Sequence, residues 1–126
     1  MLRATLLPEE STRLYNECPR TELVYCAHHF TNCEYMLLIF KYVIIKGYIP
    51  IVPFLVLPPP ILESIGFEQQ DFLGHDLRIL DKCDRLWIFG DYEDGGVAVE
   101  RNWWHNNKNT LIIYIKLEEV CENITN

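Results

Sequence analysis

The stretch GHDLRILDKCDRLWIFGDYEDGGVAVERNWW, residues 74–104, decides the fold. It predicts the end of a helix, a buried strand, an acidic turn, and then a helix that opens on Gly95 and Gly96. The strand core, residues 86–89, is apolar without alternation, which is typical of a strand covered on both faces. Glu100 follows in the first turn or so of the second helix, so its carboxylate is expected at the carboxyl edge of a strand. Open α/β sheets place their ligand sites at that edge.

Apolar runs alternate with helical patterns on both sides of this stretch. We predict strands over residues 22–27, 48–54, 85–90 and 110–115, with helices over residues 31–46, 67–82 and 96–106 between them. A polar lead-in, residues 1–21, carries one short helix over residues 8–18. Two prolines in the second strand delete ladder donors, so that strand is expected at an edge or broken near its end. Residues 55–66 contain three consecutive prolines and are predicted to form a loop, either a lid or a plain connection.

The order of these elements predicts an α/β protein with right-handed crossovers. We expect a three-layer sandwich, in which helices cover both faces of a parallel, flavodoxin-like or Rossmann-like sheet of four to five strands. At 126 residues the chain is expected to form a single domain over residues 1–126. The helix over residues 31–46 is apolar almost all round, which indicates packing against a second subunit. A homodimer or a higher homo-oligomer is therefore expected.

Charge and composition exclude several classes of protein. The net charge is −7, and nucleic-acid binders need a basic face, so no nucleic acid polymer is expected as a partner. Five cysteines without CxxC spacing are interpreted as reduced thiols of a cytoplasmic protein. The apolar run over residues 35–45 is too short to span a bilayer, so no membrane partner is expected. No P-loop or GxGxxG motif is present, and no cofactor is expected.

Glu100 is the first candidate for chemistry. The helix macrodipole near an amino end favours an ionised carboxylate, which is the form that a nucleophile needs. Gly95 and Gly96 would let backbone N–H groups approach a bound ligand closely. The alternative is a glutamate that only complements the helix dipole, and spacing alone does not exclude it.

Further candidates lie on the neighbouring elements. Asp76 lies mid-helix, where aspartate has poor propensity, so it is either solvent-facing or used. Tyr25 and His28, with Phe30 in the turn that follows, form the other wall of the same crevice, and core packing is the alternative for Tyr25. The histidines show no HxH or HxxxH spacing, so no metal is expected. The three tryptophans are interpreted as core or subunit-interface residues.

Three segments together carry a resemblance to a known family. They are VYCAHHF over residues 24–30, GYIPIVPFLVLP over residues 47–58, and LDKCDRLWIFG over residues 80–90. The chain resembles the nucleoside 2-deoxyribosyltransferase superfamily, which includes the nucleoside 5′-monophosphate N-glycosidases, and in particular a small branch common in phages and bacteria. The resemblance covers about residues 23 to 115.

The resemblance implies roles for four residues. Glu100 resembles the nucleophile, Asp76 resembles the aspartate that manages the proton of the base, and Tyr25 resembles the tyrosine that positions the nucleophile. Asp94 resembles the acidic residue that holds the sugar 5′-hydroxyl. The monophosphate N-glycosidases have a serine there that contacts phosphate. Since Asp94 would repel a phosphate dianion, an unphosphorylated nucleoside is favoured.

Three functions are compatible with this reading. The first is an enzyme that cleaves or exchanges an N-glycosidic bond through a carboxylate nucleophile. The second is a non-catalytic binder of a nucleoside or nucleotide derivative on the same fold, which the departure from the superfamily's Gly-Pro to His28 and His29 keeps open. The third is a small structural or regulatory oligomer without a ligand. The predicted substrate-binding residues are Asp94, His28, Phe30, Gly95 and Gly96.

Overall fold

The computed structural model describes residues 7–93 and 95–125, with the side chains of residues 30, 31, 33 and 123–125 left out. Its centre is one parallel sheet of four strands in the order β2-β1-β3-β4. The strands are β1 (Leu23–Ala27), β2 (Ile49–Ile51), β3 (Arg85–Phe89) and β4 (Ile112–Ile115). The predicted α/β class and parallel sheet are confirmed, and the strand order is that of flavodoxin-like sheets.

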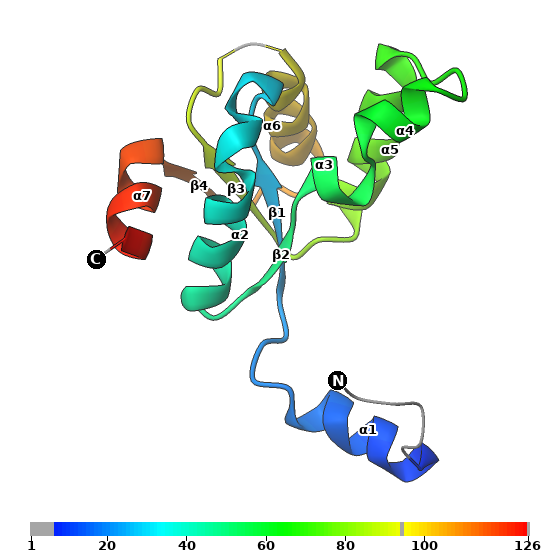
Figure 1. Ribbon diagram of the computed structural model, residues 1–126, viewed down its shortest axis with the longest axis vertical. Helices are drawn as coiled ribbons and strands as arrows, with labels where there is room; N and C mark the ends of the chain where they lie inside the picture. Colours follow the sequence, from blue (N-terminus) through cyan, green and yellow to red (C-terminus); the bar gives the residue numbers. More distant parts are fainter. Residues whose placement is uncertain (1–6, 94, 126) are drawn as a thin grey trace.

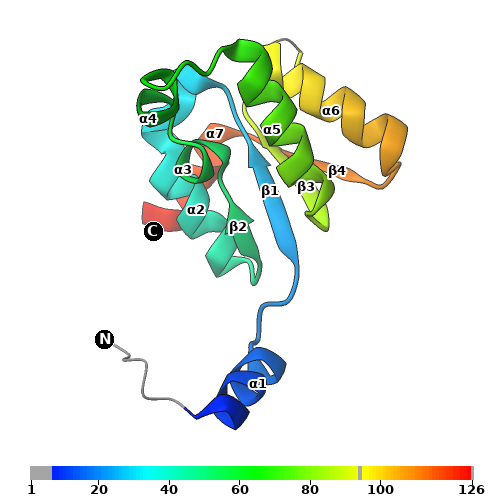
Figure 2. The same ribbon diagram turned by 90° about the vertical axis from the view of Figure 1, so that its right-hand side faces the viewer.

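Two helical layers cover the sheet, as Figures 1 and 2 show. Helices α2 (Met36–Ile45) and α7 (Leu117–Thr125) pack together on one face, and α5 (Gln69–Asp81) and α6 (Gly95–Asn107) on the other. The path from β1 to β2 runs one way across the sheet, and the paths from β2 to β3 and β4 run the other way. Right-handed crossovers therefore put α2 opposite α5 and α6. The direction reverses between β1 and β3, where such sheets open a crevice at their carboxyl edge.

The core is built on β1 and β3, whose side chains are buried on both faces from the second residue of each strand. Val24 and Cys26 face the layer of α2 and α7, whereas Tyr25 and Ala27 face the layer of α5 and α6. This two-sided burial explains why neither strand alternates between apolar and polar residues. Trp87 packs into the first of these layers and Trp104 into the second. The interpretation of these two tryptophans as core residues is therefore confirmed.

The long helix predicted over residues 31–46 is wrong at its start. The 3₁₀ helix η1 (Phe30–Tyr35) occupies the first part, and α2 begins only at Met36. The backbone departs from helical angles at Asn32, whose N–H donates to the carbonyl of His29. The turn that this hydrogen bond closes lies after β1 and before α2. His28 and His29 therefore stay close to the sheet.

The predicted loop over residues 55–66 and the length of the second strand are also wrong. Two short helices fill this part of the chain, α3 (Pro53–Val56) and α4 (Pro59–Glu63), and each carries proline in its first turn. Proline fits there because the missing N–H has no intrahelical partner at that position. Pro53 thus ends β2 at Ile51 rather than at residue 54, while β2 is the edge strand that its prolines predicted.

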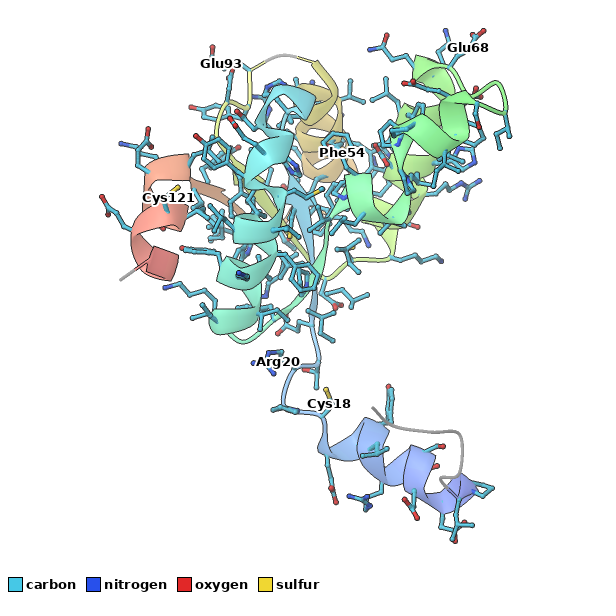
Figure 3. The ribbon with its side chains drawn as sticks, viewed as in Figure 1. Cys18, Arg20, Phe54, Glu68, Glu93 and Cys121 are labelled. Atoms are coloured by element: carbon cyan, nitrogen blue, oxygen red, sulfur yellow. The ribbon has the colours of Figure 1, made fainter. Side chains whose placement is uncertain are left out.

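Helix α1 (Pro8–Glu17) stands apart from the sheet in Figure 1 and has no buried residue. Cys18 and Arg20 lie on the segment that joins it to β1 in Figure 3, and Arg20 Nε donates to the carbonyl oxygen of Ile44 over 3.3 Å. Leu37 and Ile45 on α2 are exposed. The expected homo-oligomer stays a prediction. Within the described residues, no helix combines the length and apolar character needed to cross a membrane.

The two-sided core predicts a sharp contrast between two leucines. Leu80 is 0% exposed beneath the sheet, while Leu111 before β4 is 80% exposed. We expect Leu80→Ala to lower the free energy of unfolding by about 2–5 kcal/mol, because it leaves a cavity in the core. The matched change Leu111→Ala should move it by about 0.5 kcal/mol or less. Urea unfolding followed by circular dichroism measures both, and similar losses in the two variants would contradict this packing.

Candidate active site at the carboxyl edge of β1

A cavity of about 410 Å³ opens at the point where the sheet reverses direction. The segment after β1 lines it, together with the segment from α3 to α5 and the amino-terminal half of α6. Its lining residues are His28, His29, Pro53, Phe54, Leu57, Pro59, Glu63, Phe67, Gln69, Phe72, Leu73, Asp76, Gly96 and Glu100. Its volume falls within the range of small-molecule sites in proteins.

Tyr25 and Glu100 form the buried base of this cavity. Tyr25 is 0% exposed on β1, and its hydroxyl donates a hydrogen bond to Oε2 of Glu100, which is 5% exposed on α6. Val97, Glu100 and Trp104 are the buried residues of α6, and their spacing of three and four residues places them on one face of the helix. Glu100 therefore lies in a row of buried side chains and also lines the cavity.

Burial sets the protonation of Glu100. It raises the pKa of the carboxyl group to about 8, the hydrogen bond from Tyr25 lowers that pKa, and the charge of Asp76 raises it further. Burial thus opposes the ionised form of Glu100 that the helix dipole was expected to favour. Glu100 is the sixth residue of α6, whereas the influence of the dipole fades within the first turn. Burial also raises the pKa of Tyr25 well above its usual value, so Tyr25 remains a hydrogen-bond donor.

Asp76 brings a second carboxyl group to the same cavity. It lies in the middle of α5 and is only partly exposed, so it is not the fully solvated residue that the alternative described. Burial raises its pKa to about 6, and the neighbouring His75 opposes that shift. Asp76 and Glu100 also interact electrostatically. Among the acids that line the cavity, Asp76 and Glu100 thus have pKa values raised to different extents, which is the arrangement that acid–base chemistry needs.

His28 lies above β1 on the opposite wall. It is buried, and its Nδ1 is 3.1 Å from the carbonyl oxygen of Cys26. Its ring meets Phe54 edge to face, with ring centroids 5.0 Å apart. Phe54 projects from α3 into the space between that segment and α6 (Figure 3).

The other predicted site residues have different outcomes. Gly96 lines the cavity, whereas Gly95 is absent from the lining among the described residues. Gly95 has a positive φ of 65° and starts α6 against His29, from whose Cε1 an added Cβ would lie 3.3 Å away. A glycine there allows the turn and the close approach of that ring. Asp94 and the side chain of Phe30 lie outside the described residues.

Sequence reasoning missed the apolar wall of the cavity. This wall comes from the segment between β2 and α5 and from the start of α5 itself, and it consists of Phe54, Leu57, Phe67, Phe72 and Leu73. The prolines that suggested a loop instead begin α3 and α4, and α3 carries Phe54 into the wall. The available signal was the position of the segment directly after β2, because such connections lie at the carboxyl edge of the sheet.

The described part of the chain was expected to carry neither a metal site nor disulfides, and these expectations stay predictions. No group of three His, Cys, Asp or Glu side chains there is close enough to hold a metal ion. Cys18, Cys26 and Cys83 are free thiols. Burial raises the pKa of Cys83 to about 12 and that of Cys26 further, so neither buried sulfur is a thiolate at neutral pH.

The raised pKa of Glu100 predicts a pH-dependent stability. The carboxyl group keeps its proton in the fold up to about pH 8, whereas the unfolded chain releases it near 4.5. This contribution is fully present below pH 4.5 and is lost as the pH rises through 8, on the order of a few kcal/mol at most. Relative to wild type, Glu100→Gln should therefore gain stability in urea unfolding at pH 9 compared with pH 5. Glu118→Gln, at an exposed position, should follow wild type. Parallel pH curves for wild type and Glu100→Gln would contradict a buried, protonated Glu100.

Comparison with known proteins places this site within a family. Residues 23–114 match the model of a family described as a domain of unknown function, DUF7768. No curated protein and no solved structure matches the chain. The matched segment runs from the first residue of β1 to β4 and contains every residue that lines the cavity. Because it covers well over half of the chain, the protein belongs to the DUF7768 family.

Proposed function

We propose that this protein cleaves or exchanges the N-glycosidic bond of a ribonucleoside or deoxyribonucleoside through a covalent ester on Glu100. One observation carries the proposal. A buried glutamate, held by the hydroxyl of Tyr25, shares a nucleoside-sized cavity with a second carboxyl group on Asp76. Two carboxyl groups with separate protonation states are the working parts of a retaining glycosidase. The resemblance to the nucleoside 2-deoxyribosyltransferase superfamily supplies the nucleoside as the substrate class.

The first step forms the ester. An oxygen of the Glu100 carboxylate attacks the anomeric carbon of the sugar while the bond to the base nitrogen breaks. The electron pair of that bond goes to the base, and the proton of Asp76 neutralises it. Tyr25 holds one carboxylate oxygen of Glu100, which directs the other towards the sugar.

The second step resolves the ester. Water or the nitrogen of a second base attacks the anomeric carbon, and the bond to Glu100 breaks with its electrons returning to the carboxylate. Asp76, now ionised, takes the proton of the attacking group. Water yields the free sugar and a base acceptor yields a new nucleoside, so hydrolysis and transfer differ only in the attacking molecule.

The acids require one proton between them for this chemistry. With pKa values raised to about 6 for Asp76 and about 8 for Glu100, the pair holds one proton around neutral pH. Burial favours the proton on Glu100, because this carboxyl group is the more deeply buried of the two. A bound base that accepts a hydrogen bond from a protonated Asp76 favours its transfer to Asp76, and the Tyr25 hydroxyl stabilises the carboxylate that remains.

The rest of the cavity suits an uncharged nucleoside. The apolar wall offers aromatic and aliphatic surface to a flat base. Among the described residues that line the cavity there is no Lys or Arg, while Glu63, Asp76 and Glu100 are acidic. A phosphate group would lack a cationic partner there. We therefore propose unphosphorylated nucleosides as substrates, in agreement with the charge of Asp94.

A second candidate function is binding without turnover. The observation that favours it is the raised pKa of Glu100, because a protonated carboxyl group donates a hydrogen bond and does not attack carbon. Such a protein would retain a nucleoside or a nucleotide derivative as a sensor or a store. Calorimetry that detects tight binding, with chromatography that detects no released base, selects this function.

Chromatography of a nucleoside panel tests the enzyme directly. The panel holds ribonucleosides, deoxyribonucleosides and their monophosphates, each with and without a free acceptor base. We expect the wild-type protein to release or exchange base, and Glu100→Ala to lose roughly a thousand-fold or more in rate. Azide should restore the release of base in Glu100→Ala and yield a glycosyl azide, because it fills the place of the missing carboxylate.

The control is Glu118→Ala, an exposed position outside the cavity, which should retain wild-type activity. Equal activity in Glu100→Ala and wild type would contradict the assignment of the nucleophile. An inert panel at high protein concentration would contradict the enzyme altogether and leave the binding function.

A further inference from the structure

We propose that His28 makes the site selective for ligands that present a hydrogen-bond donor, an O–H or N–H group, to its Nε2 atom. This inference rests on the proposed function for its choice of nucleosides as probes. It goes beyond that function because neither carboxyl group takes part in it. Its basis is the hydrogen bonding of a buried ring.

The backbone fixes which ring nitrogen of His28 carries hydrogen. Nδ1 lies 3.1 Å from the carbonyl oxygen of Cys26, and a carbonyl oxygen only accepts hydrogen bonds. Nδ1 is therefore the donor. In a neutral imidazole the other nitrogen then has a lone pair and acts as an acceptor. Burial lowers the pKa of His28, which supports the neutral ring.

Within the described part of the chain, the acceptor that results has no hydrogen-bond partner. His28 is 4% exposed, and its Nε2 is buried without a hydrogen bond to any described residue. Buried polar atoms are ordinarily paired, and an unpaired one on a residue that lines a cavity is a candidate partner for a ligand group or an ordered water. The ring also lines the same cavity as Asp76 and Glu100.

Packing restrains this ring. Phe54 meets it at an interplanar angle of 89°, and the hydrogen bond to Cys26 anchors it on the side of the strand. Rotation that brought Nδ1 into the cavity would break the bond to Cys26 and leave its carbonyl without that donor. The ring is thus held with Nε2 as a fixed acceptor. A fixed acceptor favours ligands that donate a hydrogen bond over ligands that do not.

The chemistry of the acceptor decides which ligands fit. A lone pair attracts a hydroxyl or an N–H group and repels carboxylate and ionised phosphate oxygens. A nucleoside carries donors of two kinds, the hydroxyls of its sugar and the amino or ring N–H groups of its base. Both satisfy Nε2, and analogues that lack one donor at a time distinguish them.

Nuclear magnetic resonance tests the tautomer first. Long-range proton–nitrogen correlation on nitrogen-15-labelled protein reports which ring nitrogen carries hydrogen. We expect His28 as the Nδ1–H tautomer at neutral pH, with a shift of the Nε2 resonance when adenosine or deoxyadenosine binds. A ring protonated at Nε2 in the free protein would overturn the proposal.

Calorimetry then tests selectivity. The ligands are adenosine, its 2′-, 3′- and 5′-deoxy analogues, and purine riboside, which lacks the amino group. We expect one analogue to bind wild type roughly 10- to 100-fold more weakly than adenosine. A weaker sugar analogue assigns the donor to that hydroxyl, and a weaker purine riboside assigns it to the base.

Two variants connect this difference to His28. In His28→Phe, which keeps a ring but has no acceptor, adenosine and the analogue that wild type discriminates against should bind equally. His28→Gln, whose amide oxygen can take the place of Nε2, should restore part of the preference. Circular dichroism establishes that both variants are folded, and if His28→Phe fails to fold, His28→Leu replaces it.

The outcomes separate this inference from the proposed function. Discrimination that persists unchanged in His28→Phe or His28→Leu, or the failure of every panel member to bind wild type, overturns the role of His28. If the discrimination between ligands depends on His28 but no base is released, the role of His28 is upheld and the enzymatic function is overturned. If base is released and the discrimination between ligands is the same with and without His28, the enzyme is upheld and the role of His28 is overturned.

Discussion

The hydrogen bond from Tyr25 to Glu100 is the constraint on which the rest of the site depends. It connects the central strand β1 to helix α6 across the core. A carboxyl group so deeply buried has lost its water, and the tyrosine hydroxyl is the partner that compensates for part of that loss. Because Tyr25 lies in the core of β1, the position of the carboxyl group follows from the packing of the sheet and not from a loop. Rigid elements of this kind hold reacting groups more accurately than loops do.

The same burial sets the protonation of both acids. Glu100 is the more deeply buried and has its pKa raised to about 8, while Asp76 at the side of the cavity has its pKa raised to about 6. Their mutual repulsion means that the site prefers one proton to none. In the proposed reaction, a ligand that hydrogen-bonds to Asp76 draws that proton to Asp76 and leaves Glu100 as the carboxylate that attacks. The enzyme and the binding protein proposed above differ in whether a ligand moves the proton in this way.

Much of the fold followed from simple patterns. The apolar runs at β1 and β3 and the helices between them predicted the parallel sheet, and the helix start at Gly95 put Glu100 at its carboxyl edge. The patterns failed where proline and short helices compete. Proline signals a break, but whether a loop or a new helix follows depends on packing against the sheet, which is not local information. The residues of α3 and α4 that line the cavity were missed for that reason.

The hydrogen-bond partners of the site residues were harder to predict from the sequence than the places of these residues in the fold. Spacing placed Glu100 near a helix start, yet its protonation depends on burial in the core, and on Tyr25 and Asp76, which are far away in sequence. The lone pair of His28 depends equally on a carbonyl oxygen two residues back and on the ring of Phe54. Sequence patterns predict the helices and strands. The solvation and hydrogen bonding of a side chain depend on how these elements pack against one another.

The covalent ester on Glu100 is the central claim, and intact-protein mass spectrometry tests it most directly. A 2′-deoxy-2′-fluoro nucleoside slows both steps, because fluorine destabilises the positive charge at the neighbouring anomeric carbon. The account predicts a mass increase equal to the fluorosugar, located on the peptide that contains Glu100 and absent in Glu100→Gln. Release of base without any adduct, or an adduct that persists in Glu100→Gln, would contradict it.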